Sequence, residues 1–137
     1  MQIQPYLSFN GRCDEAIAFY CATLGAEQVM LMRFRDAPVP LDPALVPPDM
    51  ADKVMHARLR IGESVLLLSD GGCSGEAGFQ GFALTLTVPD EAVADRRFAA
   101  LAEGGKVQMP LAKTFFSPRF GMLQDRFGVG WMVFVAP

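Results

Sequence analysis

Two side chains in this sequence are suited to acid–base chemistry. His56 is the only histidine in the chain, and an imidazole titrates near neutral pH, as a general base or a metal ligand requires. Asp70 ends an apolar run and precedes Gly71, so its carboxylate either caps a turn or faces a pocket at the end of a strand. We take His56 and Asp70 as the candidate catalytic residues. The structural alternatives are a half-exposed strand histidine and a turn aspartate.

A second group of side chains is suited to holding a small molecule. The Arg119 guanidinium matches a carboxylate or phosphate, although pairing with a surface acid is the more frequent use of an arginine. Tyr6 lies on the mixed face of an alternating segment, and other aromatic and sulfur-containing side chains could line an apolar cavity or pack in the core. The candidate ligand-binding residues are Gln4, Tyr6, Ser8, Phe116, Arg119 and Met132.

Composition excludes several classes of protein. The 137 residues are 51% hydrophobic and 20% charged, with a net charge of −3 and no basic stripe, so we expect a globular protein that does not bind nucleic acid. No apolar run is long enough to span a bilayer, and the N-terminus lacks the pattern of a secretory signal. Cys13, Cys21 and Cys73 are odd in number and have no metal-ligand spacing, which favours free thiols in the cytoplasm.

The first half of the chain alternates between strand and helix patterns. A helix ending near Gly25 follows the first strand, and a proline-rich stretch, 36–52, predicts an irregular loop that is functional or mobile. On the strand from Val54 we expect Met55 and Ala57 to face the core, with Val54 and His56 on the mixed face. The predicted elements are strands at 3–9, 27–35, 54–61 and 64–69 and a helix at 12–24.

The second half repeats this order of elements. Asp14–Ala18 (DEAIA) and Asp90–Ala94 (DEAVA) match and stand at the start of the only helix expected in each half. Asp90 is the expected N-cap, and the turn 125–128 joins the last two strands. The predicted strands are 82–88, 106–114, 119–124 and 130–135. The repeat predicts two βαβββ modules, 1–72 and 81–137, within one domain.

A single βαβββ module leaves one face of its sheet uncovered. Two such modules can form a curved, open eight-stranded sheet with the helices outside and a pocket within the curve. We therefore predict an α+β fold of this kind.

Several motifs resemble the vicinal-oxygen-chelate superfamily, which holds glyoxalase I, bleomycin-resistance proteins and extradiol dioxygenases. They are the opening Pro5-Tyr6-Leu7-x-Phe9-x-Gly11, the helix Ala16-Ile17-x-Phe19-Tyr20 and the ending Arg119-Phe120-Gly121-Met122…Asp125-x-Phe127-Gly128-x-x-Trp131. The PhnB-like branch, often labelled as demethylubiquinone methyltransferases, is the most similar. The resemblance covers almost the whole chain and implies a homodimer.

Metal-dependent members of the superfamily place one ligand on the first and last strands of each module. By position these ligands would fall near Gln4, near Asp70 or Ser69, near Phe82 or Ala83, and near Met132. A divalent ion needs about four nitrogen or oxygen donors. Of these positions only Gln4 and Asp70 (or Ser69) carry an oxygen or nitrogen donor in the side chain, and the Met132 thioether is a weak ligand. We therefore expect no metal cofactor, with a weakly bound divalent metal as the alternative.

Two functions remain open on the sequence. The first is metal-independent binding of a small apolar or aromatic ligand, as the bleomycin-resistance branch implies. The second is a lyase, isomerase or dioxygenase relative that uses a residual site near Gln4, His56 and Asp70. A methyltransferase would rest on the branch label alone, because no glycine-rich nucleotide loop supports it.

Overall fold

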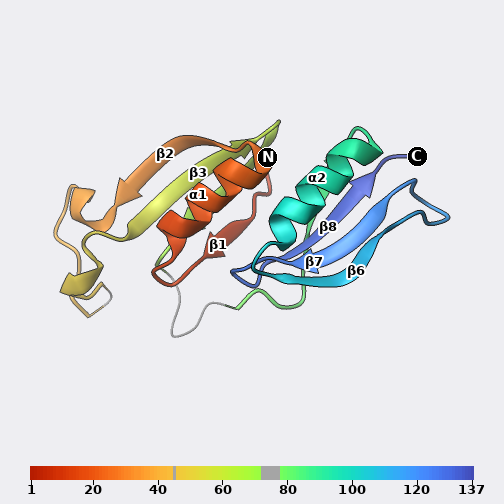
Figure 1. Ribbon diagram of the computed structural model, residues 1–137. Coiled ribbons are helices and arrows are strands. Elements are labelled where there is room, and N and C mark those ends of the chain that lie inside the picture. The colour runs from red at the N-terminus through yellow and green to blue at the C-terminus, as the bar shows by residue number, and fades with distance from the viewer. Residues whose placement is uncertain (45, 72–77) are drawn as a thin grey trace. The chain divides into compact units, whose positions relative to one another are not determined.

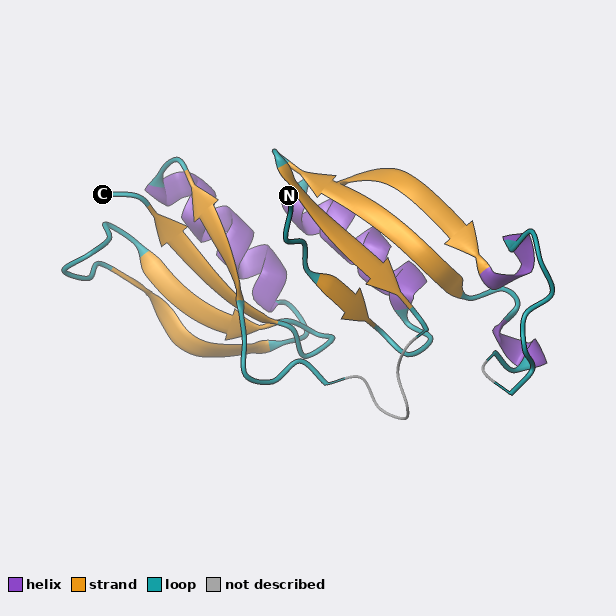
Figure 2. Ribbon diagram, turned by 180° about the vertical axis from the view of Figure 1, so that it is seen from behind, coloured by secondary structure: helices purple, strands orange, loops and turns teal. Residues whose placement is uncertain are grey.

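The computed structural model describes residues 1–44, 46–71 and 78–137 (Figure 1). The chain divides into two compact units, Met1–Ala77 and Gly78–Pro137. Each unit contains one four-stranded sheet with one helix packed on one of its faces (Figures 1 and 2). The predicted α+β fold of two βαβββ modules is thus confirmed, with the eight strands arranged as two four-stranded sheets. Cys73 lies outside the described residues.

The first unit has strand order β1-β4-β3-β2, with β1 parallel to β4 and the other pairs antiparallel. The core forms where α1 packs on this sheet. Helix α1 ends at Gly25, whose backbone N–H donates to the Tyr20 carbonyl. Gly25 has φ 64°, a left-handed backbone conformation that glycine tolerates without strain. The elements are β1 (Tyr6–Ser8), α1 (Cys13–Leu24), β2 (Glu27–Arg33), η1 (Phe34–Asp36), η2 (Pro48–Met50), β3 (Val54–Ile61) and β4 (Ser64–Ser69).

The second unit repeats this topology, with strand order β5-β8-β7-β6. The Asp90 carboxylate accepts a 2.9 Å hydrogen bond from the Val93 N–H, so the predicted N-cap is confirmed. The Asp125 carboxylate accepts bonds from the backbone of Phe127 and Val129 and from the Trp131 indole, which fixes the predicted turn before the last strand. The elements are β5 (Leu84–Val88), α2 (Glu91–Ala102), β6 (Lys106–Ala112), β7 (Phe120–Gln124) and β8 (Gly130–Val135).

We call the face of each sheet that points away from its own helix the open face. Alternation defines it, since buried side chains such as Leu68 and Val133 point to the helix and their strand neighbours point away. Gly121 confirms the direction in the second sheet, because a Cβ there would lie 2.8 Å from Phe98 of α2. The open faces carry the half-exposed and polar strand residues.

Two details differ from the alternation expected in the first unit. Ile3 was expected on the buried face of a strand but is 98% exposed, because β1 begins only at Tyr6. Val54 was expected on the mixed face but is fully buried. The register explains this, since Met32 pairs with His56 whereas Arg33 pairs with Val54. Met55 is therefore an extra residue, a β-bulge that turns Val54 toward the core.

Candidate functional site

Asp70 is buried, and all of the hydrogen bonds that the structure gives its side chain come from backbone N–H groups. One carboxylate oxygen accepts from the N–H groups of Gly11, at 2.7 Å, and Cys13, at 2.9 Å. The other oxygen accepts from the Val54 N–H at 3.0 Å. The carboxylate thus caps the start of α1 and ties it to the start of β3, which is a structural role that differs from the turn cap expected of an aspartate before glycine.

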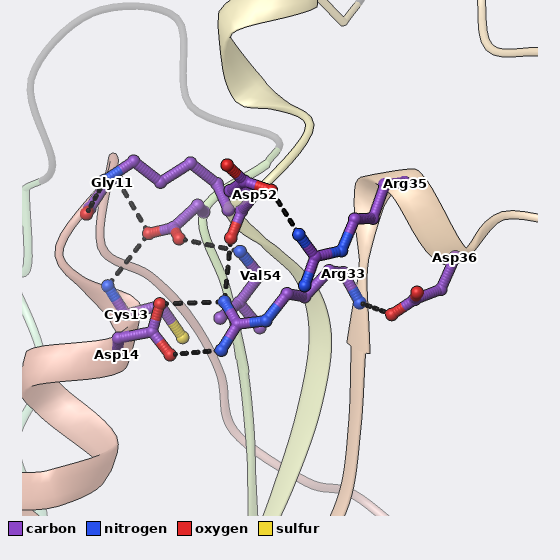
Figure 3. A network of polar contacts seen from close by, with 10 residues as sticks. Gly11, Cys13, Asp14, Arg33, Arg35, Asp36, Asp52 and Val54 are labelled. Carbon is purple, nitrogen blue, oxygen red and sulfur yellow. Dashed lines mark hydrogen bonds and ion pairs between the residues drawn. The ribbon is translucent and has the colours of Figure 1, made fainter.

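Two arginine side chains close the base of the proline-rich loop next to the start of α1 (Figure 3). The Arg33 guanidinium donates to both oxygens of Asp14 and to the Asp52 carbonyl, and its backbone N–H donates to Asp36. Arg35 pairs with the Asp52 carboxylate. The hydrogen bond from Arg33 holds the pKa of the Asp14 carboxyl below its ordinary value. Both ends of the loop are therefore anchored next to the N-terminus of α1.

His56 lies on the open face of the first sheet and stacks on Tyr6. The two ring centroids are 5.9 Å apart and the rings are inclined by 24°. Tyr6 is 52% exposed, so this pair is accessible from the open face. The structure therefore brings together one candidate catalytic residue and one candidate ligand-binding residue that are 50 positions apart in the sequence.

The strand register extends this open face across all four strands. Tyr6 pairs with Leu67, Leu67 with Arg58, and Arg58 with Met30. Residues that pair directly share a face of the sheet, with Cβ atoms about 5 Å apart. Arg58 is exposed in the middle of this row. Alternation along β3 puts Arg58 on the same face as His56, two residues away.

The remaining polar candidates at the N-terminus lie on the edge of the first sheet. Gln4 is half-buried and precedes β1. Ser8 is half-buried within β1, and its hydroxyl donates to the Gly71 carbonyl at 2.8 Å. Ser8 thus helps to fasten the end of β4 to β1.

The open face of the second sheet is rich in sulfur and aromatic rings. Thr85, Met132, Met122 and Met109 form one register row across the four strands. Met122 and Met132 are half-buried, and Met109 is 45% exposed. This row presents three flexible thioether side chains on one face, which suits contact with an apolar molecule.

A phenylalanine cluster lies next to the methionine row. Phe134 pairs with Phe120 on this same open face. Phe116, in the connection from β6 to β7, contacts Phe120 at 5.0 Å and stacks on Phe134 at 6.4 Å between ring centroids. The adjoining connection borders a shallow hollow of about 340 Å³. Phe116 and Met132 are among the candidate ligand-binding residues predicted from the sequence. Phe134 and Met122 are not, because strand alternation alone does not show which face the helix covers.

Arg119 is engaged with the helix of its own unit. Its guanidinium makes two hydrogen bonds, of 3.0 and 2.9 Å, with the carboxylate of Asp95 on α2. This bidentate hydrogen bond lowers the pKa of Asp95 and raises that of Arg119. The geometry matches the surface-pair alternative for Arg119.

The cysteines do not form a reactive site in the described residues. Cys13 is fully buried and burial raises the pKa of its thiol, while Cys21 is partly exposed. Within residues 1–44, 46–71 and 78–137, no three His, Cys, Asp or Glu side chains come together as metal ligands. In the same residues, no helix is long and apolar enough to span a membrane.

Comparison with known proteins places this geometry in a family. Residues 1–134 match the family described as 3-demethylubiquinone-9 3-methyltransferase. Protein YjdN of Escherichia coli K12 is 38% identical over 97% of this chain and 94% of its own length. Protein PA1353 of Pseudomonas aeruginosa is 45% identical with a TM-score of 0.85, covering 99% of this chain and 98% of that one. The PhnB protein of Bacillus cereus is 28% identical with a TM-score of 0.79, covering 99% and 100%.

More distant solved structures share the fold alone. They include a glyoxalase-related enzyme from Fulvimarina pelagi, with 18% identity and a TM-score of 0.63 over 100% of this chain and 89% of that one. The fosfomycin resistance protein FosX of Listeria monocytogenes has 11% identity and a TM-score of 0.66 over 100% and 93%. The family match over residues 1–134, with the YjdN and PhnB relatives, shows that the chain belongs to the 3-demethylubiquinone-9 3-methyltransferase family, in its PhnB-like branch.

Proposed function

We propose that this protein binds a small apolar or aromatic molecule without a metal ion. The observation that carries the proposal is the open face of the second sheet, where Met109, Met122 and Met132 adjoin Phe116 and Phe134. These side chains are half-exposed rather than packed beneath α2. Covering them with an apolar ligand removes hydrocarbon from water, which favours binding by about 25 cal/mol per Å² of buried area.

The donor set supports binding without a metal. Ala83 and Met132, at two of the four positions that carry ligands in metal-dependent relatives, offer no nitrogen or oxygen donor in their side chains. At a third position, both oxygens of Asp70 already accept backbone hydrogen bonds. Gln4 would remain as a single neutral donor. These residues do not fit a divalent ion, so we derive no step through one.

The family name gives no reason to prefer methyl transfer. The description names a demethylubiquinone, whose quinone ring is a flat, unsaturated group that the apolar side chains of the second open face suit. The sequence lacks a glycine-rich nucleotide loop for a methyl donor, so we propose binding rather than catalysis. The enzymatic alternative would use His56 with Gln4 and Asp70. Because the Asp70 carboxylate already accepts hydrogen bonds from three backbone N–H groups, His56 is the main candidate for a catalytic residue in that alternative.

We further propose a cytoplasmic homodimer. Light scattering would test the oligomeric state.

An NMR titration tests the binding proposal. Uniformly ¹⁵N-labelled protein, treated with EDTA and dialysed, is titrated with the neutral aromatic probe 2-naphthamide. We expect shift changes on β7 and β8, and we expect Met132→Thr to weaken binding about tenfold, since roughly 1.4 kcal/mol of apolar contact is lost. Met50→Thr, in the proline-rich loop, is the control and keeps the wild-type affinity. Unchanged affinity in Met132→Thr, or no shift changes on β7 and β8, would defeat the proposal.

A further inference from the structure

We propose that the open face of the first sheet recognises the carboxylate of an aromatic acid, with Arg58 as the residue that binds the anion. This site lies in the other unit from the methionine row, so it goes beyond the proposed function, and it takes an aromatic molecule that carries a negative charge. The Tyr6–His56 pair would receive the ring of that ligand. Three observations support this assignment, namely the pairing of the arginines, the neighbours of Arg58 and the spacing along the sheet.

Arg58 differs from every other arginine of its unit. Residues 1–77 contain five arginines. The other four each form an ion pair, namely Arg12 with Glu15, Arg33 with Asp14, Arg35 with Asp52 and Arg60 with Glu27. Within the part of the chain that the structure describes, Arg58 has no such carboxylate partner. Its guanidinium is therefore available to an anion from outside the described residues.

The cross-strand neighbours of Arg58 on the open face are apolar, and its neighbours along β3 are His56 and Arg60, which is paired with Glu27. Its direct cross-strand partners are Leu67 on β4 and Met30 on β2. His56 is two residues away on the same face of β3 and stacks on Tyr6. A cation set among hydrocarbon and rings complements an amphiphilic anion, and the planar guanidinium fits a carboxylate with two parallel hydrogen bonds.

The spacing suits a small aromatic acid. Tyr6 and Arg58 lie in one register row with Leu67 between them. Two strand spacings of about 4.8 Å separate β1 from β3, so the Cα atoms of Tyr6 and Arg58 are roughly 10 Å apart. A bicyclic aromatic carboxylate can span most of this separation while its charged end meets the guanidinium. The net charge of −3 on the whole chain argues against a polyanion such as nucleic acid as the occupant.

Two isosteric probes and a matched pair of variants test the assignment. The EDTA-treated, full-length protein is titrated with 2-naphthoate and with neutral 2-naphthamide, and binding is followed by NMR. We expect naphthoate to shift resonances of β1 and β3 and the side-chain Nε–H of Arg58. Arg58→Gln should weaken naphthoate binding about tenfold or more, because a charge-assisted pair is lost. It should leave naphthamide binding unchanged.

Arg60→Gln is the control, because Arg60 follows on the same strand and open face but is already paired with Glu27. It should leave the affinity for naphthoate within about twofold of wild type. If naphthoate binds no better than naphthamide, or if both variants weaken it equally, the assignment of Arg58 is wrong while the proposed function stands. If neither probe binds, the proposed function fails together with this assignment.

Discussion

Removal of the Asp70 carboxylate should destabilise the first unit strongly. In Asp70→Ala, the N–H groups of Gly11, Cys13 and Val54 lose their acceptor, and the side chain that held them is 2% exposed. Little water can replace it at that site. The carboxylate connects the start of α1 to the start of β3, so both elements should be loosened together.

The magnitude follows from the number of bonds. A hydrogen bond to a charged group contributes about 1.5–3 kcal/mol, and such contributions at one carboxylate add only partly. Three bonds then predict a loss of roughly 3–5 kcal/mol, a large share of the ~5–15 kcal/mol that stabilises a typical domain. Asp70→Asn keeps one oxygen but turns an amide N–H₂ toward a backbone donor. We expect it to cost about half as much.

Urea unfolding followed by far-UV circular dichroism measures this loss. With a slope of about 1–3 kcal/mol per molar urea, the midpoint of Asp70→Ala should fall by roughly 2 M. Asp49→Ala, an exposed acid of the proline-rich loop, is the control and should stay within about 0.5 kcal/mol of wild type. An Asp70→Ala protein as stable as this control would refute the structural role given to the carboxylate.

Three further predictions concern single side chains. Gly105→Ala should destabilise the protein by about 1–3 kcal/mol, because its Cβ would lie 2.1 Å from a backbone oxygen of β7. Asp14→Asn should cost at most ~1 kcal/mol at pH 7 and progressively less in acid, since Arg33 lowers the pKa of this exposed carboxyl and the gain is lost as pH falls through that lowered pKa. Arg119→Gln should raise the pKa of Asp95, measured by NMR, and leave 2-naphthamide binding unchanged.

Each of these has a result that would contradict it. Gly78→Ala, where an added Cβ meets nothing within 4 Å, is the control for Gly105→Ala and should be close to neutral. A stability difference between Asp14→Asn and wild type that stays constant as the protein is acidified would remove the ion pair as its cause. Loss of probe affinity in Arg119→Gln would return Arg119 to the ligand site.

Local patterns predicted much of the fold because the determinants are close in sequence. The bounds of β3 and β4 follow from alternation around the Gly62-Glu63 turn. Asp90 predicts the start of α2 because its carboxylate accepts a hydrogen bond from the Val93 N–H, only three residues along the chain. Two matching segments at the helix starts were enough to indicate the repeat. These features depend on contacts within a few residues, which a single sequence displays directly.

The sequence could not show features that arise from long-range contacts. The bulge at Met55 depends on the partner strand β2, so the burial of Val54 was assigned to the wrong face. Asp70 meets Gly11 and Cys13 across almost sixty residues, and its type alone suggested a turn or a pocket. The stacking of Tyr6 on His56 likewise requires β4 to lie between their strands.

The central claim is that apolar side chains, without a metal, hold the ligand. Isothermal titration of 2-naphthamide into protein stripped with EDTA, repeated after addition of Zn²⁺ and of Mn²⁺, tests it most directly. The account predicts the same affinity, within about twofold, in all three titrations, and a loss of about tenfold in Met132→Thr. Binding that appears only when a metal ion is restored would contradict it.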